Sequence, residues 1–404
     1  MPAATIREII AHSPEELAQE FDSLKVDKGG IGIMSPKGFF HVLRLRALKS
    51  PAANILKQEM LSLGGECATS RSVLLGDPEP QDVIVMGTRR QLAKLETRLK
   101  AQPFGLNQAA GQIEAFLKKI SGPSRPLGSL LLTLAGDPSH YPIITGVLNV
   151  TPDSFSDGNA YLDKSAAVRH GMTLLEQGAD IIDVGGESTR PGSDPVSAEE
   201  ELRRVLPVVA GLREQTDRPV SIDTMKAQVA REALQAGASL VNDVSAGRHD
   251  PRILEVVAQA GCPIVLMHMQ GEPKTMQQNP HYDYLMDELH RFFDERMTRA
   301  VKAGVREEQI ILDPGIGFGK RRDDNYEILR RLRELRVFGR PVLVGASRKS
   351  FLQSELGGTP RERLEESIAA GTIAMMNGAD ILRVHDVVPA LKSRIVFQRL
   401  MDRV

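Results

Sequence analysis

One repeated pattern in the second part of the chain constrains the fold more than any other feature. A helical segment ends at a glycine, and a short apolar strand then leads into polar residues. These glycines are Gly178, Gly237, Gly261, Gly304 and Gly378. Glycine is favoured there because a helix often closes on a residue with left-handed backbone angles. Further apolar segments at 144–150, 218–224 and 340–347 bring the predicted strands to eight.

Continuous apolar strands that alternate with amphipathic helices are typical of a parallel sheet covered on both faces. Eight such units within roughly 260 residues have the size of a (β/α)8 TIM barrel. A doubly wound open sheet is the alternative, and the strand count disfavours it. We therefore predict an α/β protein built on a TIM barrel.

A chain of 404 residues has room for a second domain. The segment 121–129, SGPSRPLGS, contains two prolines and two glycines and is predicted to be a linker. We predict a smaller N-terminal α/β domain over 1–120 and the barrel over 130–404. In the first domain we expect a helix opened at Ser13, strands over 42–48 and 82–88, and a helix over 51–63. No chemical motif stands out there, which favours a packing or oligomerisation role.

Composition restricts the partners that this chain can have. The 51 Lys and Arg residues nearly balance the 52 Asp and Glu residues, which argues against a general nucleic-acid or membrane-surface binder. Cys67 and Cys262 are too few for a disulfide framework or a cysteine-based metal site. The chain shows neither a signal peptide nor an apolar run near the ~20 residues of a membrane span. We expect a cytoplasmic enzyme that acts on small molecules.

Barrel geometry predicts where the chemistry lies, because strand ends and their following loops meet at the C-terminal mouth. Polar or charged residues follow nearly every predicted strand: Asn149, the run 187–190, Asp223, the pair 242–243, His268, Asp313, the pair 348–349, Arg383, His385 and Asp386. A folded barrel has no structural need for that set, so we interpret it as functional.

Three of these residues suit a flat heterocycle with adjacent N–H donors. Asp223, Asn242 and Asp313 each end an apolar strand, and a carboxylate can accept two parallel hydrogen bonds. A second group of candidate residues is cationic and indicates that the substrate also carries a phosphate or diphosphate group. These residues are Arg190, Arg348, Lys349, Arg383 and His385.

A third feature is Asn149 with the loop 151–158. An amide oxygen beside a diphosphate suits Mg²⁺, which keeps several waters and takes its charge balance from phosphate. Asp153 and Asp157 could assist through water, and the Pro, Ser and Gly content of the loop is typical of a lid.

The chain resembles the dihydropteroate synthase family in eight separate segments. The matching segments are GVLNVTPDSFSDG (146–158), DVGGESTRPGS (183–193), SIDT (221–224), VNDVSAG (241–247), MHMQGEP (267–273), DPGIGFGK (313–320), GASRKSF (345–351) and RVHDV (383–387). The resemblance spans roughly 144–400 and implies a transferase of folate biosynthesis. Such an enzyme condenses 6-hydroxymethyl-7,8-dihydropterin diphosphate with 4-aminobenzoate, and releases 7,8-dihydropteroate and diphosphate. The resemblance also implies a homodimer and a target of sulfonamides.

The resemblance further implies roles for individual residues. Asn149 would contact the Mg²⁺ on the diphosphate. The pterin ring would be held by Asp223, Asn242, Asp313 and Lys349. The diphosphate would lie beside Thr189, Arg190, Arg383 and His385. The 4-aminobenzoate pocket would be shaped by Pro191, Phe318, Ser350 and the loop 151–158. Asp153 or Asp157 is hypothesised to shield positive charge that develops at the reacting carbon.

Two rival functions share part of this pattern. A methyltetrahydrofolate-dependent corrinoid methyltransferase would use the same pterin-holding residues, but it has no diphosphate to expel. A non-catalytic pterin-binding protein has no need of Arg383 and His385. The set of cations on the diphosphate side therefore favours the synthase.

Overall fold

The structure is a computed structural model, and it describes residues 6–11, 13–120, 134, 136–150, 160–188, 193–353, 359 and 362–401. The chain forms two compact units, one over residues 1–124 and one over residues 125–403, with Val404 grouped with the first.

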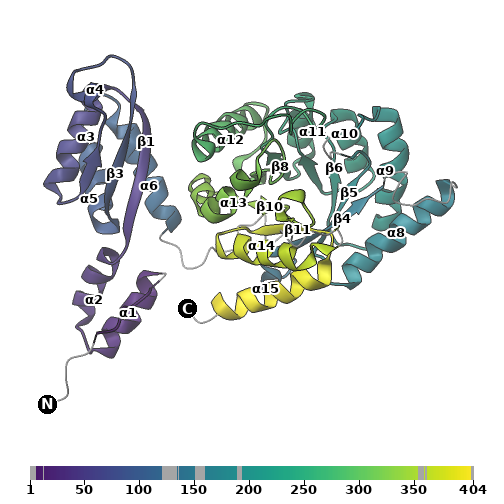
Figure 1. Cartoon of the computed structure of the whole chain (residues 1–404), viewed down its shortest axis with the longest axis horizontal. Coiled ribbons are helices and arrows are strands. Elements are labelled where there is room, and N and C mark those ends of the chain that lie inside the picture. Colours follow the sequence, from purple (N-terminus) through teal and green to yellow (C-terminus); the bar gives the residue numbers. More distant parts are fainter. Residues whose placement is uncertain are drawn as a thin grey trace. The chain divides into compact units, whose positions relative to one another are not determined.

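The N-terminal unit is built on a three-stranded antiparallel sheet of order β1-β3-β2. Its strands are β1 (Phe40–Leu48), β2 (Glu66–Ala68) and β3 (Gln81–Thr88). Its helices are α1 (Pro14–Ser23), α2 (Lys28–Met34), α3 (Ser50–Ser62), α4 (Arg71–Leu74), α5 (Arg89–Leu99) and α6 (Leu106–Ile120) (Figure 1). The predicted strands and helices of this region occur within about two residues of their expected bounds.

Local sequence explains two of these helix starts. The Ser13 side chain accepts a hydrogen bond from the Glu16 backbone N–H at 3.2 Å and so opens α1. Thr88 and Gln91 form a reciprocal capping box at the start of α5. Each cap satisfies N–H groups that have no partner within the first helical turn. A separate apolar core, which includes Leu56, Val85 and Leu92, lies between the sheet and these helices.

The second unit is a (β/α)8 barrel, as predicted. Its strands are β4 (Ile143–Asn149), β5 (Ile181–Gly185), β6 (Val220–Asp223), β7 (Leu240–Asp243), β8 (Ile264–Met267), β9 (Ile310–Asp313), β10 (Leu343–Val344) and β11 (Ile381–Val384). They pair in parallel in the order β10-β11-β4-β5-β6-β7-β8-β9. A bridge from Leu312 to Val342 joins β9 to the residue before β10 and closes the ring.

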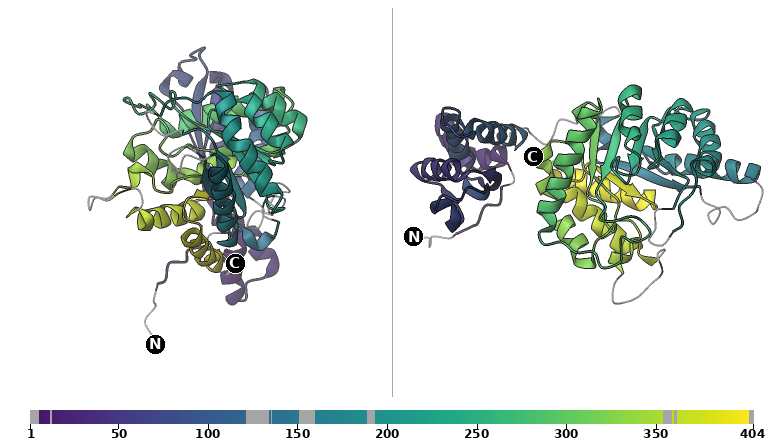
Figure 2. Two further views of the ribbon diagram at one scale, coloured as in Figure 1. Left: turned by 90° about the vertical axis from the view of Figure 1, so that its right-hand side faces the viewer. Right: turned by 90° about the horizontal axis from the view of Figure 1, so that it is seen from above.

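Eight helices follow the eight strands and surround them (Figure 2). They are α8 (Ala160–Glu176), α9 (Ala198–Arg213), α10 (Ala227–Gln235), α11 (Arg252–Ala260), α12 (Leu285–Lys302), α13 (Arg322–Arg331), α14 (Leu364–Met376) and α15 (Val387–Met401). The five glycines of the repeated pattern all have positive φ angles, between 67° and 108°. The sequence-based interpretation of these glycines as helix ends is therefore confirmed.

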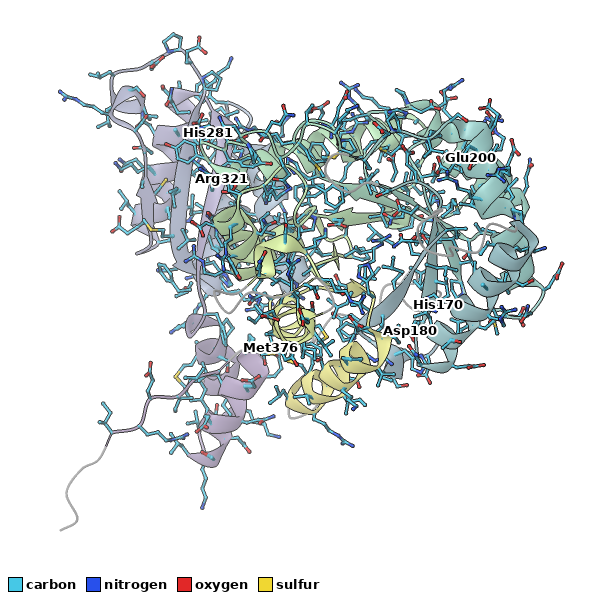
Figure 3. All side chains as sticks on the ribbon, turned by 45° about the vertical axis from the view of Figure 1, so that its right-hand side comes forward. His170, Asp180, Glu200, His281, Arg321 and Met376 are labelled. Atoms are coloured by element: carbon cyan, nitrogen blue, oxygen red, sulfur yellow. The ribbon has the colours of Figure 1, made fainter. Side chains whose placement is uncertain are left out.

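Two copies of the repeat also tie neighbouring strands together. Asp180 precedes β5 and accepts a hydrogen bond from the Ile144 N–H of β4 at 2.8 Å. Asp380 precedes β11 and accepts from the Val342 N–H at the same distance. Arg394 of α15 donates to Asp180 at 2.7 Å, and Figure 3 shows Asp180 beside that helix. These carboxylates set the register at the amino ends of the strands.

The interior of the barrel changes from apolar to polar toward the mouth. The lower layer is made of Ile143, Ile181, Leu240, Val265, Ile311, Leu343 and Ile381, with Leu134 against it. Strand residues alternate between the two faces of a sheet. Two positions further along the chain, the inward residues are therefore mostly polar: Thr145, Asp183, Asn242, Met267, Asp313, Gly345 and Arg383. This polar layer forms the floor of the candidate site.

Candidate active site

The deepest part of the site is a network of carboxylates, an amide and one guanidinium. Arg383 on β11 donates from Nε to Asp183 Oδ2 at 2.6 Å, and from Nη2 to Asp223 Oδ2 at 2.7 Å. Asn242 Nδ2 donates to the same Asp183 oxygen at 3.0 Å. Four strands, β5, β6, β7 and β11, thus contribute to one charged network at the mouth.

Burial dominates the electrostatics of this network. It raises the pKa of the Asp223 carboxyl, and the Arg383 guanidinium opposes that shift. Burial acts to lower the pKa of Arg383, but the Asp183 and Asp223 carboxylates together outweigh it and raise that pKa, so the positive charge is held firmly. The arrangement keeps one guanidinium and two carboxyl groups together at the base of the site.

Asp313 and Lys349 form one wall of the site. Asp313 is only 6% exposed, and burial raises the pKa of its carboxyl. Its Oδ1 accepts from the Gly315 N–H at 2.7 Å. Lys349 donates to the Ile316 carbonyl oxygen and lies 4.4 Å from the centre of the Phe318 ring. Burial lowers the pKa of Lys349 to about 8, and the Asp313 carboxylate opposes that shift.

His268 and Lys320 form a buried pair behind this wall. Lys320 Nζ lies 3.0 Å from His268 Nδ1 and donates to the Phe318 carbonyl at 3.0 Å. Burial lowers the pKa of Lys320 to about 7 and keeps the pKa of His268 well below its usual value. The pair joins the loop after β8 to the loop after β9.

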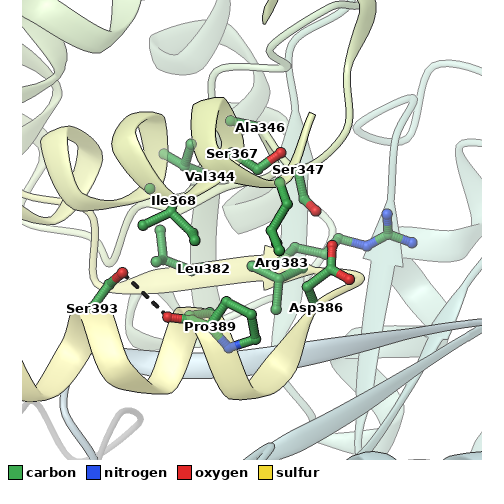
Figure 4. A pocket seen from close by; sticks show the side chains of 14 residues that line it. Val344, Ala346, Ser347, Ser367, Ile368, Leu382, Arg383, Asp386, Pro389 and Ser393 are labelled. Carbon is green, nitrogen blue, oxygen red and sulfur yellow. Dashed lines mark hydrogen bonds between the residues drawn. The ribbon is translucent and has the colours of Figure 1, made fainter. Parts of the chain in front are cut away.

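The remaining cations of the mouth have different partners. Arg348 makes a two-point ion pair with Asp386, with nitrogen–oxygen distances of 2.8 and 2.5 Å. The His385 N–H donates to Ser347 Oγ at 3.2 Å. Figure 4 shows Arg383 extending away from the small cavity beside α15, which Ser367, Ile368 and Pro389 help to line.

Comparison with known proteins identifies the family. A family model described as "Pterin binding enzyme" matches residues 145–385. Dihydropteroate synthase of Escherichia coli (strain K12) is 48% identical over 266 residues, which are 66% of this chain and 94% of that protein. This chain belongs to the dihydropteroate synthase family.

Two further comparisons extend this assignment. A solved structure, "Dihydropteroate synthase from Xanthomonas albilineans in complex with 7,8-dihydropteroate", matches with a TM-score of 0.58 and 43% identity. That match covers 65% of this chain and 95% of the solved one. A probable bifunctional folylpolyglutamate synthase/dihydropteroate synthase of Halobacterium salinarum (strain ATCC 700922 / JCM 11081 / NRC-1) is 39% identical over 385 residues. These residues are 95% of this chain and 46% of that protein, so similarity there extends into the N-terminal unit.

The structure brings most of the predicted site residues to one end of the synthase-family barrel. Asn149, Asp223 and Asp313 end their strands at the mouth, Asn242 is the last residue but one of β7, and Arg383 lies on β11. Residues of the neighbouring loops, Phe318, Lys349 and Ser350, follow β9 and β10, and His385 follows β11. The remaining predicted residues lie outside the described part of the chain: Asp153, Asp157 and the rest of 151–158, Thr189, Arg190 and Pro191.

Asp183 was missed as a site residue by sequence reasoning. It lies inside the matched segment 183–193, yet its position in the middle of β5 suggested a strand interior rather than a strand end. The signal that could have found it is a carboxylate in an otherwise apolar strand, because a buried charge needs a partner. That partner, Arg383, is 200 residues away in sequence.

The flanks of the segment after β5 are held by a second buried cluster. Lys226 lies 2.5 Å from both Glu187 Oε2 and Glu201 Oε2, and the Glu201 side chain is fully buried. The other Glu187 oxygen accepts from the Val196 N–H at 3.1 Å. Glu187 and Val196, on the two sides of 189–192, are thereby tied to Lys226 at the start of α10 and, through it, to Glu201 on α9.

Proposed function

We propose that this chain joins 6-hydroxymethyl-7,8-dihydropterin diphosphate to 4-aminobenzoate, giving 7,8-dihydropteroate and diphosphate. The observation that carries the proposal is the polar floor of the barrel in a chain of the dihydropteroate synthase family. There, Asp183 and Asp223 hold Arg383 beside Asn242. In the reaction, the amine nitrogen attacks the methylene carbon of the pterin. The carbon–oxygen bond breaks, diphosphate leaves with the electron pair, and the amine loses a proton.

The pterin ring would lie on the polar floor. Asp223, Asn242 and Asp313 offer oxygens to its adjacent N–H groups, and Lys349 offers a donor. Asn242 and Asp313 are nearly fully buried, and Asp223 is the last residue of β6. These three side chains are therefore pre-positioned before the substrate arrives.

The diphosphate would lie toward Arg383 and His385, with Thr189 and Arg190 as further candidates. Arg383 already has two carboxylate partners, so we expect it to bridge the pterin floor and the leaving group rather than to act as an isolated cation. An arylamine is unprotonated near pH 7, so the chain's task is to stabilise charge on the departing diphosphate rather than to supply a strong base.

Mg²⁺ is the expected companion of the diphosphate, and the residues at the mouth fit it. Gly185 is close to two oxygens at the mouth: a Cβ added there would be 3.8 Å from Asn149 Oδ1 and 3.7 Å from Asp223 Oδ2. An amide oxygen and a carboxylate oxygen thus lie near the same side-chain-free backbone position, and both are oxygen donors that Mg²⁺ prefers. Asn149 would hold the ion, which when bound neutralises charge on the leaving group.

The 4-aminobenzoate would lie between the loops after β9 and β10. Phe318 and Ser350 come from these loops, and Pro191 from the loop after β5 is expected to join them. This is also where a sulfonamide would compete. Asp153 and Asp157 keep their hypothesised role near the reacting carbon. If both Asp→Asn variants kept the wild-type turnover, that role would be wrong.

A homodimer is proposed for the assembly, and exposed apolar side chains on α14 and α15 support it. Ile373 and Met376 on α14 are 49% and 45% exposed, and Ile395 and Leu400 on α15 are 50% and 57% exposed. Neighbouring apolar side chains in water favour association. Ile395→Glu should dissociate the dimer in sedimentation experiments, whereas Val301→Glu on α12 should leave it intact.

No helix in the described part of the chain is long and apolar enough to span a bilayer. Location in the cytoplasm remains a prediction from the sequence. A fluorescent fusion or a cell fractionation experiment tests it.

The deciding experiment measures diphosphate release from purified protein with the pterin diphosphate and Mg²⁺, with and without 4-aminobenzoate. We expect release that depends on the arylamine, with 7,8-dihydropteroate as the product. Tight pterin binding without turnover would overturn the proposal. Methyl transfer to a corrinoid would replace it with the methyltransferase alternative.

A further inference from the structure

A small cavity lies inside the barrel, between the apolar layer and the polar floor of the site. It leaves about 10 Å³ for the centre of a water molecule. Each lining residue is at most 4% exposed. The lining residues are Thr145, Ile181, Asp183, Ser221, Leu240, Asn242, Val265, Leu343 and Ile381.

Three polar atoms of this lining lack a hydrogen-bond partner among the described residues. They are Thr145 Oγ1, Asp183 Oδ1 and Ser221 Oγ. The three residues are 3%, 1% and 1% exposed, so bulk water does not reach them. Buried polar atoms in folded proteins are nearly always paired, and an internal water molecule is a common partner.

The cavity is directly connected to the active-site network through Asp183. One oxygen of this carboxylate accepts from Arg383 at 2.6 Å and from Asn242 at 3.0 Å. The other oxygen is the unpartnered atom of the cavity. Whatever occupies the cavity therefore helps to set the orientation of the carboxylate that holds Arg383.

We propose that this cavity binds one water molecule, and that Thr145 and Ser221 are positioning residues that act through it. The water donates to Asp183 Oδ1 and accepts from the two hydroxyl groups. This set of partners lies within the two to four that a buried water usually has. A metal cation suits the cavity less well, because Ile181, Leu240, Val265, Leu343 and Ile381 offer it no side-chain oxygen.

The first test is a high-resolution crystal structure of the full chain without substrates. We expect an ordered water within hydrogen-bonding distance of Thr145, Ser221 and Asp183. We expect that density to disappear in a Thr145→Val/Ser221→Ala double variant. The absence of a water in the wild-type cavity would overturn the proposal.

The second test concerns positioning and rests on the proposed function. The double variant should raise the KM for the pterin diphosphate roughly two- to tenfold, the range expected for one lost hydrogen bond. The KM for 4-aminobenzoate should not change. Ser239→Ala is the matched control, because the Ser239 hydroxyl bonds to the Val220 carbonyl outside the cavity.

Unchanged KM for the pterin diphosphate in a double variant that has lost the water would overturn the positioning role. The crystallographic result does not depend on turnover. A failure of the proposed reaction is therefore distinguishable from a failure of the water site.

Discussion

At the scale of single residues, Asp183 shows how one buried carboxylate can organise several neighbours. Its side chain is 1% exposed, and one of its oxygens accepts hydrogen bonds from both Arg383 and Asn242. Removal of one partner from a buried ion pair is costly, because the remaining charge loses its compensation. Asp223 also pairs with Arg383, so the loss should fall at the lower end of the usual range.

We predict that Asp183→Asn lowers the free energy of unfolding by about 3 kcal/mol. It should also weaken pterin binding, since Arg383 is then held by Asp223 alone. Urea unfolding and calorimetry measure the two effects. Asp217→Asn is the control, because Asp217 is fully exposed and lies 3.9 Å from its arginine partner. Equal stability of the two variants would contradict the prediction.

Lys320 leads to a pH-dependent prediction. Burial lowers its pKa from 10.5 to about 7 in the folded chain. Between these values the unfolded chain binds a proton that the folded chain has released. The contribution of Lys320 to stability therefore rises as the pH increases from about 7 toward 10.5. The difference in unfolding free energy between wild type and Lys320→Met should grow in favour of wild type over this interval. Lys302→Met, at the exposed end of α12, is the matched control for loss of a lysine at the surface.

At the scale of elements, the loop after β9 is shaped by its glycines. A Cβ added at Gly315 would come 1.9 Å from the His268 carbonyl oxygen, and one added at Gly319 would come 2.3 Å from that of Gln270. Both glycines also have positive φ angles. The backbones of the loops after β8 and β9 thus approach more closely than any side chain allows, and this contact fixes Asp313 and Lys320.

Gly315→Ala should therefore be more harmful than a substitution that meets only backbone strain. Gly261 offers the matched control, because it has the same φ of 67° and nothing lies within 4 Å of an added Cβ. We predict a loss of about 1–2 kcal/mol for Gly261→Ala and of about 2–5 kcal/mol for Gly315→Ala. Thermal or urea unfolding of both variants measures the difference. Similar losses would show that the two loops can separate without cost.

At the scale of the whole molecule, the barrel unit should suffice for catalysis. The Escherichia coli relative is matched over 94% of its length by 66% of this chain. Each unit of this chain also has its own apolar core. We predict that a fragment of residues 130–404 folds and retains the turnover of the full chain. A fragment that folds, as judged by circular dichroism, but does not turn over would instead give residues 1–120 a part in the reaction.

The sequence by itself determined the elements of the barrel and most of one site. The helix-ending glycines and apolar strands are local patterns, so they predict where each strand ends and that Asp223, Asn242 and Asp313 meet at one rim. It determined β10 less well, because the apolar segment 340–347 contributes only Leu343 and Val344 to the ladder. The strands at this closure of the ring pair over few residues.

Only the tertiary structure decided which charges pair. Arg383 was predicted as a cation for diphosphate, yet in the fold it is held by Asp183 and Asp223, 200 and 160 residues away. His385, two residues later, contacts Ser347 instead. Likewise, the cavity beneath Asp183 exists because β4, β5 and β6 place Thr145, Asp183 and Ser221 around one space. Such contacts depend on barrel closure and strand register, which bring together residues that no local pattern connects.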